Sequence, residues 1–205
     1  MEAVTQPLVE WGVASTARAG EAMCGDRHLI RIESDFVLMA AVDGLGHGDE
    51  AAAAAQTAIQ TLESASTRSV IALINGCHER LRSTRGVVMS LAVFARADSS
   101  LTWAGVGNVE GLLLRASPNA SPLYESLVLR SGVVGARLPL MYAAILPVMR
   151  GDTLIFWTDG IRSDFADKLT AAGHPQKLAD RIMAKGYKAT DDALVLVVRC
   201  FGGAP

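Results

Sequence analysis

Apolar and polar positions at the beginning of the chain predict a strand followed by a β-hairpin. Residues 29–32 and 36–42 are two apolar runs joined by the polar stretch Glu33-Ser34-Asp35, which is typical of a hairpin. The second run contains no polar position, so we expect its strand to be buried on both faces. A first strand is predicted over residues 11–17.

After the hairpin, the spacing of apolar positions changes to that of helices. An alanine-rich run from Gly48 to about residue 65 predicts a helix, because alanine is the strongest helix former, and Asp49 near its start suits an N-terminal cap and the helix dipole. A second helix is predicted over residues 69–82. The apolar faces of the two helices comprise Ala52, Ala55, Ile59 and Leu62 in the first and Ile71, Ile74, Cys77, His78 and Leu81 in the second.

Beyond Gly86 the pattern is mainly that of short strands separated by turn-forming residues, with one late helix over residues 176–185. Consecutive strands joined by turns favour antiparallel pairing. We therefore predict an α+β fold in which two stacked antiparallel sheets carry helices on their outer faces, formed by a single domain over residues 1–205. The later strands are predicted over residues 87–94, 101–106, 112–115, 127–130, 143–148, 153–158 and 194–199.

The composition excludes several classes of protein. Half of the residues are apolar and 20% are charged, which excludes a disordered chain. The net charge of −2 argues against a nucleic-acid partner or an anionic membrane surface. Three cysteines without a Cys-x-x-Cys pair favour reduced thiols and a cytoplasmic location. The chain starts without the pattern of a signal peptide, and its longest apolar stretch, residues 138–149, contains two prolines and is too short to span a membrane.

Carboxylates stand beside four of the predicted strands. Asp43 and Asp159 each follow an apolar run and precede a glycine, Asp191 precedes the last strand, and Asp26 precedes the hairpin. If these strand ends meet at one edge, the carboxylates repel one another and a cation must neutralise them. An all-oxygen ligand set suits Mg²⁺ or Mn²⁺. The glycine after Asp43 and after Asp159 removes side-chain bulk beside such a site.

These acidic residues could also belong to ordinary turns or to another class of phosphatase. A single Asp-Gly pair is usually a turn, and the metal site depends on the recurrence of the pair after apolar strands. Haloacid-dehalogenase-type phosphatases also place an acidic motif after an apolar strand, but Ala41 stands where their nucleophilic aspartate is required, so this class is excluded. The chain has neither a Cys-x5-Arg loop nor a Walker-type loop.

Several motifs follow one another in a fixed order along the chain. The central one, residues 39–48, is Met-Ala-Ala-Val-Asp-Gly-Leu-Gly-His-Gly and leads into the alanine-rich helix. The others are Cys24-Gly25-Asp26, Arg85-Gly86-Val87-Val88-Met89-Ser90, Ala104-Gly105-Val106-Gly107-Asn108, Gly151-Asp152-Thr153-Leu154-Ile155-Phe156-Trp157-Thr158-Asp159-Gly160 and Thr190-Asp191-Asp192-Ala193. In this order they resemble the metal-dependent type 2C (PPM) serine/threonine phosphatases, specifically the bacterial SpoIIE/RsbU/RsbX branch and within it the RsbX type, over residues 11–199.

The resemblance implies a four-layer αββα sandwich and two bound Mn²⁺ or Mg²⁺ ions. It implies that Asp43 bridges both ions and that the Gly44 carbonyl completes one of them, while Asp159 and Asp191 hold the other. Asp26 is implied to lie beside this cluster and to bind through water or to a further ion, which makes Asp43 and Asp26 the implied catalytic residues. A hydroxide between the ions would attack phosphorus in line, without a covalent phosphoenzyme.

The same resemblance implies a phosphorylated regulatory protein as substrate, of the STAS-domain type that acts in stressosome, anti-sigma or sporulation signalling. Many family members bind the phosphate through an arginine before the first acidic motif. Here Glu21 stands at about that place, so the phosphate-binding candidates are Arg18 and Arg27, with Arg18 the nearest. The alternatives are a phosphatase-like domain that binds phosphoproteins without turnover and a hydrolase of small phosphate esters.

Five other residues have an ordinary structural interpretation beside a functional one. His47 either donates a proton to the leaving serine or faces solvent in a turn, and His78 is expected to pack on a helix face. Asp192 either orients a neighbouring ligand or is a simple turn acid, and Asn108 either supports the site or belongs to a turn. Cys24 is either redox-sensitive or a small buried residue.

Overall fold

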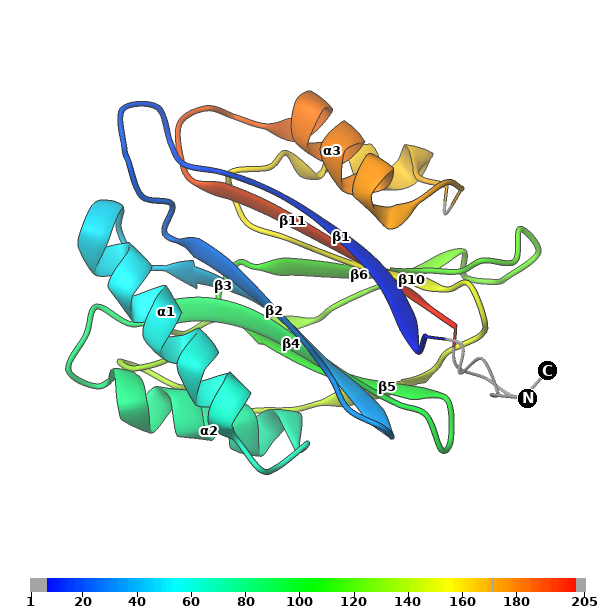
Figure 1. Ribbon diagram of the computed structural model, residues 1–205, viewed down its shortest axis with the longest axis horizontal. Coiled ribbons are helices and arrows are strands. Elements are labelled where there is room, and N and C mark those ends of the chain that lie inside the picture. Colours follow the sequence, from blue (N-terminus) through cyan, green and yellow to red (C-terminus); the bar gives the residue numbers. More distant parts are fainter. Residues whose placement is uncertain (1–6, 171, 202–205) are drawn as a thin grey trace, which may run out of the picture.

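Two β-sheets stacked face to face form the centre of the molecule, and helices cover both outer faces (Figure 1). The computed structural model describes residues 7–170 and 172–201. The first sheet has the order β1 (Val9–Thr16), β11 (Ala193–Cys200), β10 (Thr153–Trp157), β6 (Glu110–Leu114) and β7 (Tyr124–Ser126). The second has the order β2 (Asp26–Ile32), β3 (Phe36–Gly44), β4 (Val87–Ala95), β5 (Ser100–Val106) and β8 (Leu129–Arg130), and β9 (Ala144–Pro147) also pairs with β5.

The helices lie where the sequence predicts them. Helices α1 (Gly48–Ser64) and α2 (Val70–Leu81) cover the second sheet, and α3 (Pro175–Gly186) covers the first, close to the short 3-10 helix η1 (Ser163–Lys168). The strands pair in antiparallel fashion except that β8 runs parallel to β5. The predicted α+β fold of two stacked antiparallel sheets with outer helices is therefore confirmed, apart from the parallel β5–β8 pair. No helix in the described residues is both long and apolar enough to cross a membrane.

The apolar run over residues 36–42 shows why this strand has no polar alternation. Val37, Met39 and Ala41 belong to the core between the two sheets. Leu38 and Ala40 belong to the core between the second sheet and its helices. Because β3 is an interior strand of an inner layer, both of its faces are packed and neither one favours polar side chains.

Three local details differ from the prediction. Leu127 does not extend β8: its N–H donates to the Gly111 carbonyl of the first sheet, so the chain changes sheets there, and β7 before it was not predicted. The short helix η1 was also not predicted. Asp49 is not the cap of α1, because the helix begins at Gly48 and His47 occupies the N-cap without a capping side-chain bond. Asp49 lies inside the first turn, where it still faces the positive end of the helix dipole.

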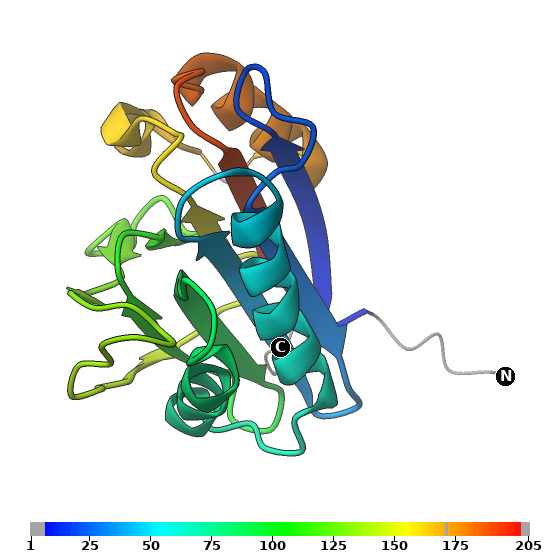
Figure 2. The same ribbon diagram turned by 90° about the vertical axis from the view of Figure 1, so that its left-hand side faces the viewer.

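The topology brings four chain segments to one end of the sandwich. In the second sheet Asp26 at the start of β2 pairs with Asp43 at the end of β3. In the first sheet the end of β10 pairs with the beginning of β11, through Trp157 and Val195, so the residues that follow β10 and precede β11 are neighbours. Figure 2 shows the molecule from this end.

Candidate active site

A cavity of about 490 Å³ opens at this end of the sandwich. Asp43, Asp159 and Asp191 line it together with Arg18 and His47, so residues from both sheets contribute. Asp26 does not line the cavity, but it lies beside Asp43 in the β2–β3 pair. The structure thus brings the four aspartates of the sequence analysis to one place, with Asp26 below the others.

Asp26 is held by a bond that crosses between the sheets. Asp26 is only 2% exposed, and its Oδ2 accepts a hydrogen bond from Thr158 Oγ1 at 2.7 Å. The same Oγ1 accepts the N–H of Leu194 at 2.9 Å, which joins the ends of β10 and β11. Burial raises the pKa of Asp26 to about 7, and the charge of Asp192 adds to this effect, while the bond from Thr158 opposes it. The sequence analysis did not identify Thr158 as a functional residue, although it lies within one of the motifs.

The pKa of Asp43 is raised more strongly than that of Asp26. Burial at the end of β3 is the main reason that its pKa rises to about 9, and the nearby charges of Asp26, Asp159 and Asp191 raise it further. Several carboxylates in one desolvated place cannot all ionise without a counter-charge. This end of the sandwich is therefore a site that a cation would stabilise.

Asp159 has polar partners on two sides. Its Oδ2 accepts a hydrogen bond from Asn108 Nδ2 at 2.7 Å, and Lys188 Nζ donates to its backbone carbonyl at 2.6 Å. Burial raises the pKa of Asp159 and the charge of Asp191 adds to this, whereas Lys188 and Asn108 lower it. Asn108 therefore supports the site, one of the two roles that the sequence left open.

Asp192 fixes the segment between β1 and β2. It is 4% exposed, and its two carboxylate oxygens accept the backbone N–H groups of Arg18 at 2.8 Å and Gly25 at 2.6 Å. The segment that it holds carries Arg18 at one end and leads into Asp26 at the other. Asp192 is thus more than a turn acid: it fixes the backbone at Arg18 and at Gly25, the residue before Asp26. Beside it, Asp191 accepts the Asp192 N–H on its own Oδ1.

Two glycines permit the close approach of the loops. A Cβ on Gly44 would lie 2.1 Å from the carbonyl oxygen of Ala51 in α1, and a Cβ on Gly160 would lie 2.0 Å from the carbonyl oxygen of Asp192. Any side chain at these positions would force the backbone apart. The glycine that follows Asp43 and the one that follows Asp159 are therefore required by packing at the site.

The two candidate phosphate-binding arginines differ in their position relative to the cavity. Arg18 lines the cavity, whereas Arg27 donates from Nη1 to the carbonyls of Cys24 and Asp26 and does not line it. Glu21, which the sequence analysis placed at about the position of the implied phosphate-binding arginine, lies beside His47, with its Oε1 2.9 Å from His47 Nδ1.

His47, His78 and Cys24 have different surroundings. His47 lines the cavity although its side chain is 53% exposed. His78 is partly buried, as expected, and its Nδ1 accepts the N–H of Gly135 at 2.9 Å. Cys24 is only partly buried and lies beside Ser15.

The donors of the site fit divalent ions of the magnesium type in kind. Asp43, Asp159 and Asp191 supply carboxylate oxygens to the lining, and hard cations such as Mg²⁺ and Mn²⁺ prefer oxygen ligands. Within residues 7–170 and 172–201, no three His, Cys, Asp or Glu side chains are arranged as a group that would hold an ion. The carboxylates therefore surround the cavity without forming a finished coordination sphere.

Comparison with known proteins shows the family of this chain. A model of the family described as Stage II sporulation protein E (SpoIIE) matches residues 33–201. The phosphoserine phosphatase RsbX of Bacillus subtilis (strain 168) is 24% identical over 144 residues, which are 70% of each chain. A solved structure from work on the bacterial stressosome, described there as a modular system adapted to control secondary messenger signalling, is 30% identical. Its TM-score is 0.82, over 93% of this chain and 99% of that one.

A further structural match supports the fold. The crystal structure of RsbX in complex with magnesium has a TM-score of 0.83 at 19% identity, over 94% of this chain and 95% of that one. At this identity the match shows the fold alone, which is the fold of PP2C-type phosphatases. Since the family model covers most of the sequence, including the segments that carry Asp43, Asp159 and Asp191, the chain belongs to the SpoIIE family of PP2C-type serine/threonine phosphatases.

Proposed function

We propose that this protein is a Mg²⁺- or Mn²⁺-dependent phosphatase that hydrolyses phosphoserine or phosphothreonine on a regulatory protein. The observation that carries the proposal is the gathering of Asp43, Asp159 and Asp191 around one cavity, with Asp26 directly beside Asp43. The electrostatic cost of this arrangement is high, and a catalytic metal centre explains why it is built into the fold.

The residues that would hold two ions come from both sheets. Asp43 would bridge the ions, with the Gly44 carbonyl on one of them and Asp159 and Asp191 on the other. Asp26 would contribute through a water molecule or to a further ion. When bound, such a pair of ions lowers the pKa of a water molecule between them and so supplies a nucleophile near neutral pH. Thr158 and Asn108 keep the carboxylates of Asp26 and Asp159 in place.

Arg18 would bind the phosphate group. It is the arginine that lines the cavity, and its backbone is tied to the buried carboxylate of Asp192. A guanidinium suits phosphate because it presents several N–H donors in one plane. The departure from the usual family position, which suggested a domain that binds without turnover, is therefore offset by an arginine at a nearby position.

The substrate that we propose is a phosphoprotein of stress signalling, of the STAS-domain type. The support is the similarity to RsbX, which is described as a phosphoserine phosphatase, and to a chain from the bacterial stressosome. The cavity has a volume of about 490 Å³ and opens at the edge of the sandwich.

The proposal is tested by measuring hydrolysis of p-nitrophenyl phosphate by the purified protein with and without Mn²⁺ or Mg²⁺. We expect turnover only with the added metal, and none in the Asp43→Ala variant. The Asp180→Ala variant, which removes an exposed carboxylate of α3, is the matched control and should behave as the wild type. Activity that persists both in EDTA and in Asp43→Ala would contradict the proposal. Comparison of a phosphoserine peptide with free nucleotides separates a protein phosphatase from a hydrolase of small esters.

A further inference from the structure

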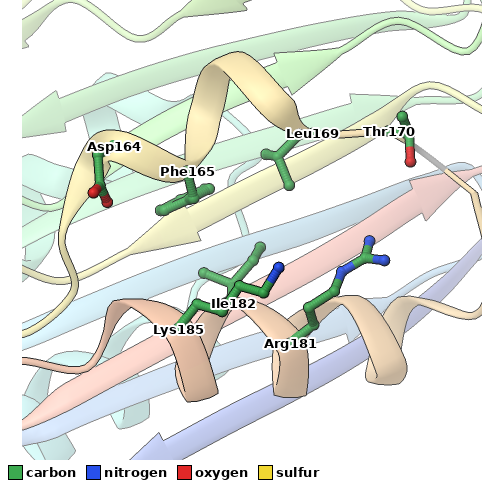
Figure 3. Close-up of a pocket in the computed structure, with 7 residues that line it drawn as sticks. All are labelled: Asp164, Phe165, Leu169, Thr170, Arg181, Ile182 and Lys185. Atoms are coloured by element: carbon green, nitrogen blue, oxygen red, sulfur yellow. The ribbon is translucent and has the colours of Figure 1, made fainter.

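A second pocket lies on the outer side of the first sheet, between η1 and α3 (Figure 3). Its volume is about 310 Å³, which is at the lower end of the range typical of small-molecule sites. It is separate in its lining from the cavity of the aspartates, because no residue lines both. The role proposed above for the four aspartates does not involve this pocket.

The inner part of the pocket is apolar and held in place. Phe165 and Leu169 line it from the side of η1, and Ile182 lines it from α3. Phe165 packs edge-on against Trp157 of β10, with ring centroids 5.0 Å apart, and Ile182 is 2% exposed. These contacts fix the apolar wall to the sheet, so a ligand would meet a surface that is already formed.

The rim of the pocket is positively charged. Arg181 and Lys185 are four residues apart on α3, and in Figure 3 both side chains extend from the helix toward η1. Neither side chain has a hydrogen-bond or ion-pair partner among the residues that the structure describes. Asp164 is the acidic residue in the lining, so the lining residues carry a net charge of about +1. An apolar wall with two unpaired cations at its rim complements a ligand that has an apolar body and an anionic head group.

We propose that this pocket binds a small amphipathic anion, such as a carboxylate on an aryl or alkyl body. The apolar body would lie against Phe165, Leu169 and Ile182, and the anionic group would contact Arg181 and Lys185. Exposed surface ion pairs are weak, but a charged group beside a buried apolar contact gains from both.

Both walls of this pocket lead directly into the site of the aspartates. Helix η1 begins four residues after Asp159, and α3 leads through Lys188, which donates to the Asp159 carbonyl, to Asp191. The two walls are also joined by the bond from the Arg162 N–H to the Gly186 carbonyl at 2.9 Å. The pocket is therefore connected through short segments to the loops that carry two of the carboxylates.

The test is a titration of the isotope-labelled full chain with 4-phenylbutyrate, followed by NMR. We expect the methyl signals of Ile182 and Leu169 to shift in a saturable way. In the double variant Arg181→Gln/Lys185→Gln the affinity should fall by at least about tenfold, because both cations that contact the anionic group are removed. The variant Lys177→Gln removes one charge from the same helix outside the pocket and should bind as the wild type does. The uncharged analogue 4-phenylbutanol should bind much more weakly than the acid.

Several outcomes would overturn the inference. These are the absence of shifts at Ile182 and Leu169, equal affinity of the double variant and the wild type, and equal binding of the alcohol and the acid. If only long acidic peptides and no small anions bind, the pocket is a docking site for a partner protein and the inference is also wrong. Because binding is followed by NMR and needs no turnover, its failure is distinguishable from a failure of the proposed phosphatase activity.

Discussion

Replacing Asp43 by asparagine should stabilise the protein in the absence of metal while abolishing its activity. In the folded protein the pKa of Asp43 is raised to about 9, mainly by burial and further by the charges of Asp26 and Asp159. In the unfolded chain the same group has its ordinary pKa of 3.8. Asparagine has nearly the same shape and no charge, so it removes the repulsion and keeps the packing at the end of β3.

The magnitude follows from proton linkage. A carboxyl group whose pKa is higher in the folded state contributes stability that is fully present below the unfolded pKa and is lost as the pH rises through the folded pKa. Between these two values the metal-free folded protein holds a proton that the unfolded chain has released, and each such proton costs about 1.4 kcal/mol of stability per pH unit. From about pH 5.5 to about pH 7.5, the wild type should therefore lose more than about 2 kcal/mol relative to Asp43→Asn.

Urea unfolding in EDTA, followed by tryptophan fluorescence at several pH values, measures this difference. Added Mg²⁺ should stabilise the wild type and leave Asp43→Asn nearly unchanged, because the variant lacks the bridging carboxylate. The exposed Asp180→Asn serves as the control and should follow the wild type at every pH. If Asp43→Asn is less stable than the wild type in EDTA, or if the stabilities of the two proteins depend on pH in the same way, burial does not raise the pKa of Asp43 as described.

Three further predictions concern the groups around the carboxylates. Arg18→Ala should raise the KM for a phosphoserine peptide by about tenfold in steady-state kinetics, because the variant lacks the guanidinium at the cavity. An unchanged KM would exclude Arg18 as the phosphate ligand. Asp192→Asn should lower the free energy of unfolding by about 2 kcal/mol in urea titrations, because the amide cannot accept from both backbone N–H groups. A loss below about 0.5 kcal/mol would contradict this role. Asn108→Ala should weaken Mg²⁺ binding about tenfold in calorimetry, because Asp159 loses the hydrogen bond from Asn108 and the pKa of Asp159 rises. An unaltered affinity would show that this hydrogen bond does not contribute to Mg²⁺ binding.

The fold was predictable from local patterns to a large extent. The unbroken apolar run of residues 36–42 predicted a strand buried on both faces, and β3 lies inside one of the two inner layers. The alanine-rich run predicted α1, whose face of small side chains packs close to the second sheet. The short elements were missed because β7 and η1 have three and six residues, too few for any periodicity to be detected.

The candidate site was predictable only in part. The motifs of the sequence identified the aspartates and the glycines that follow two of them, since these residue types stand at abrupt strand ends. The partners of the aspartates were only partly identifiable in this way. Asn108 was a candidate with two open roles and Thr158 was not singled out, and no local pattern indicates that Asn108 bonds Asp159 and Thr158 bonds Asp26.

The amino-acid sequence alone determined the types of element, the buried character of β3 and the identity of the acidic residues, because these depend on periodicity and on neighbouring residues. The tertiary structure alone decided which groups meet. Asp26 and Thr158 are 132 positions apart and belong to different sheets, and Arg18 reaches the cavity because Asp192, 174 positions away, holds its backbone. The pocket between η1 and α3 likewise exists only because the chain returns α3 across the first sheet beside η1. Such contacts depend on how strands pair over the whole chain, which no local pattern records.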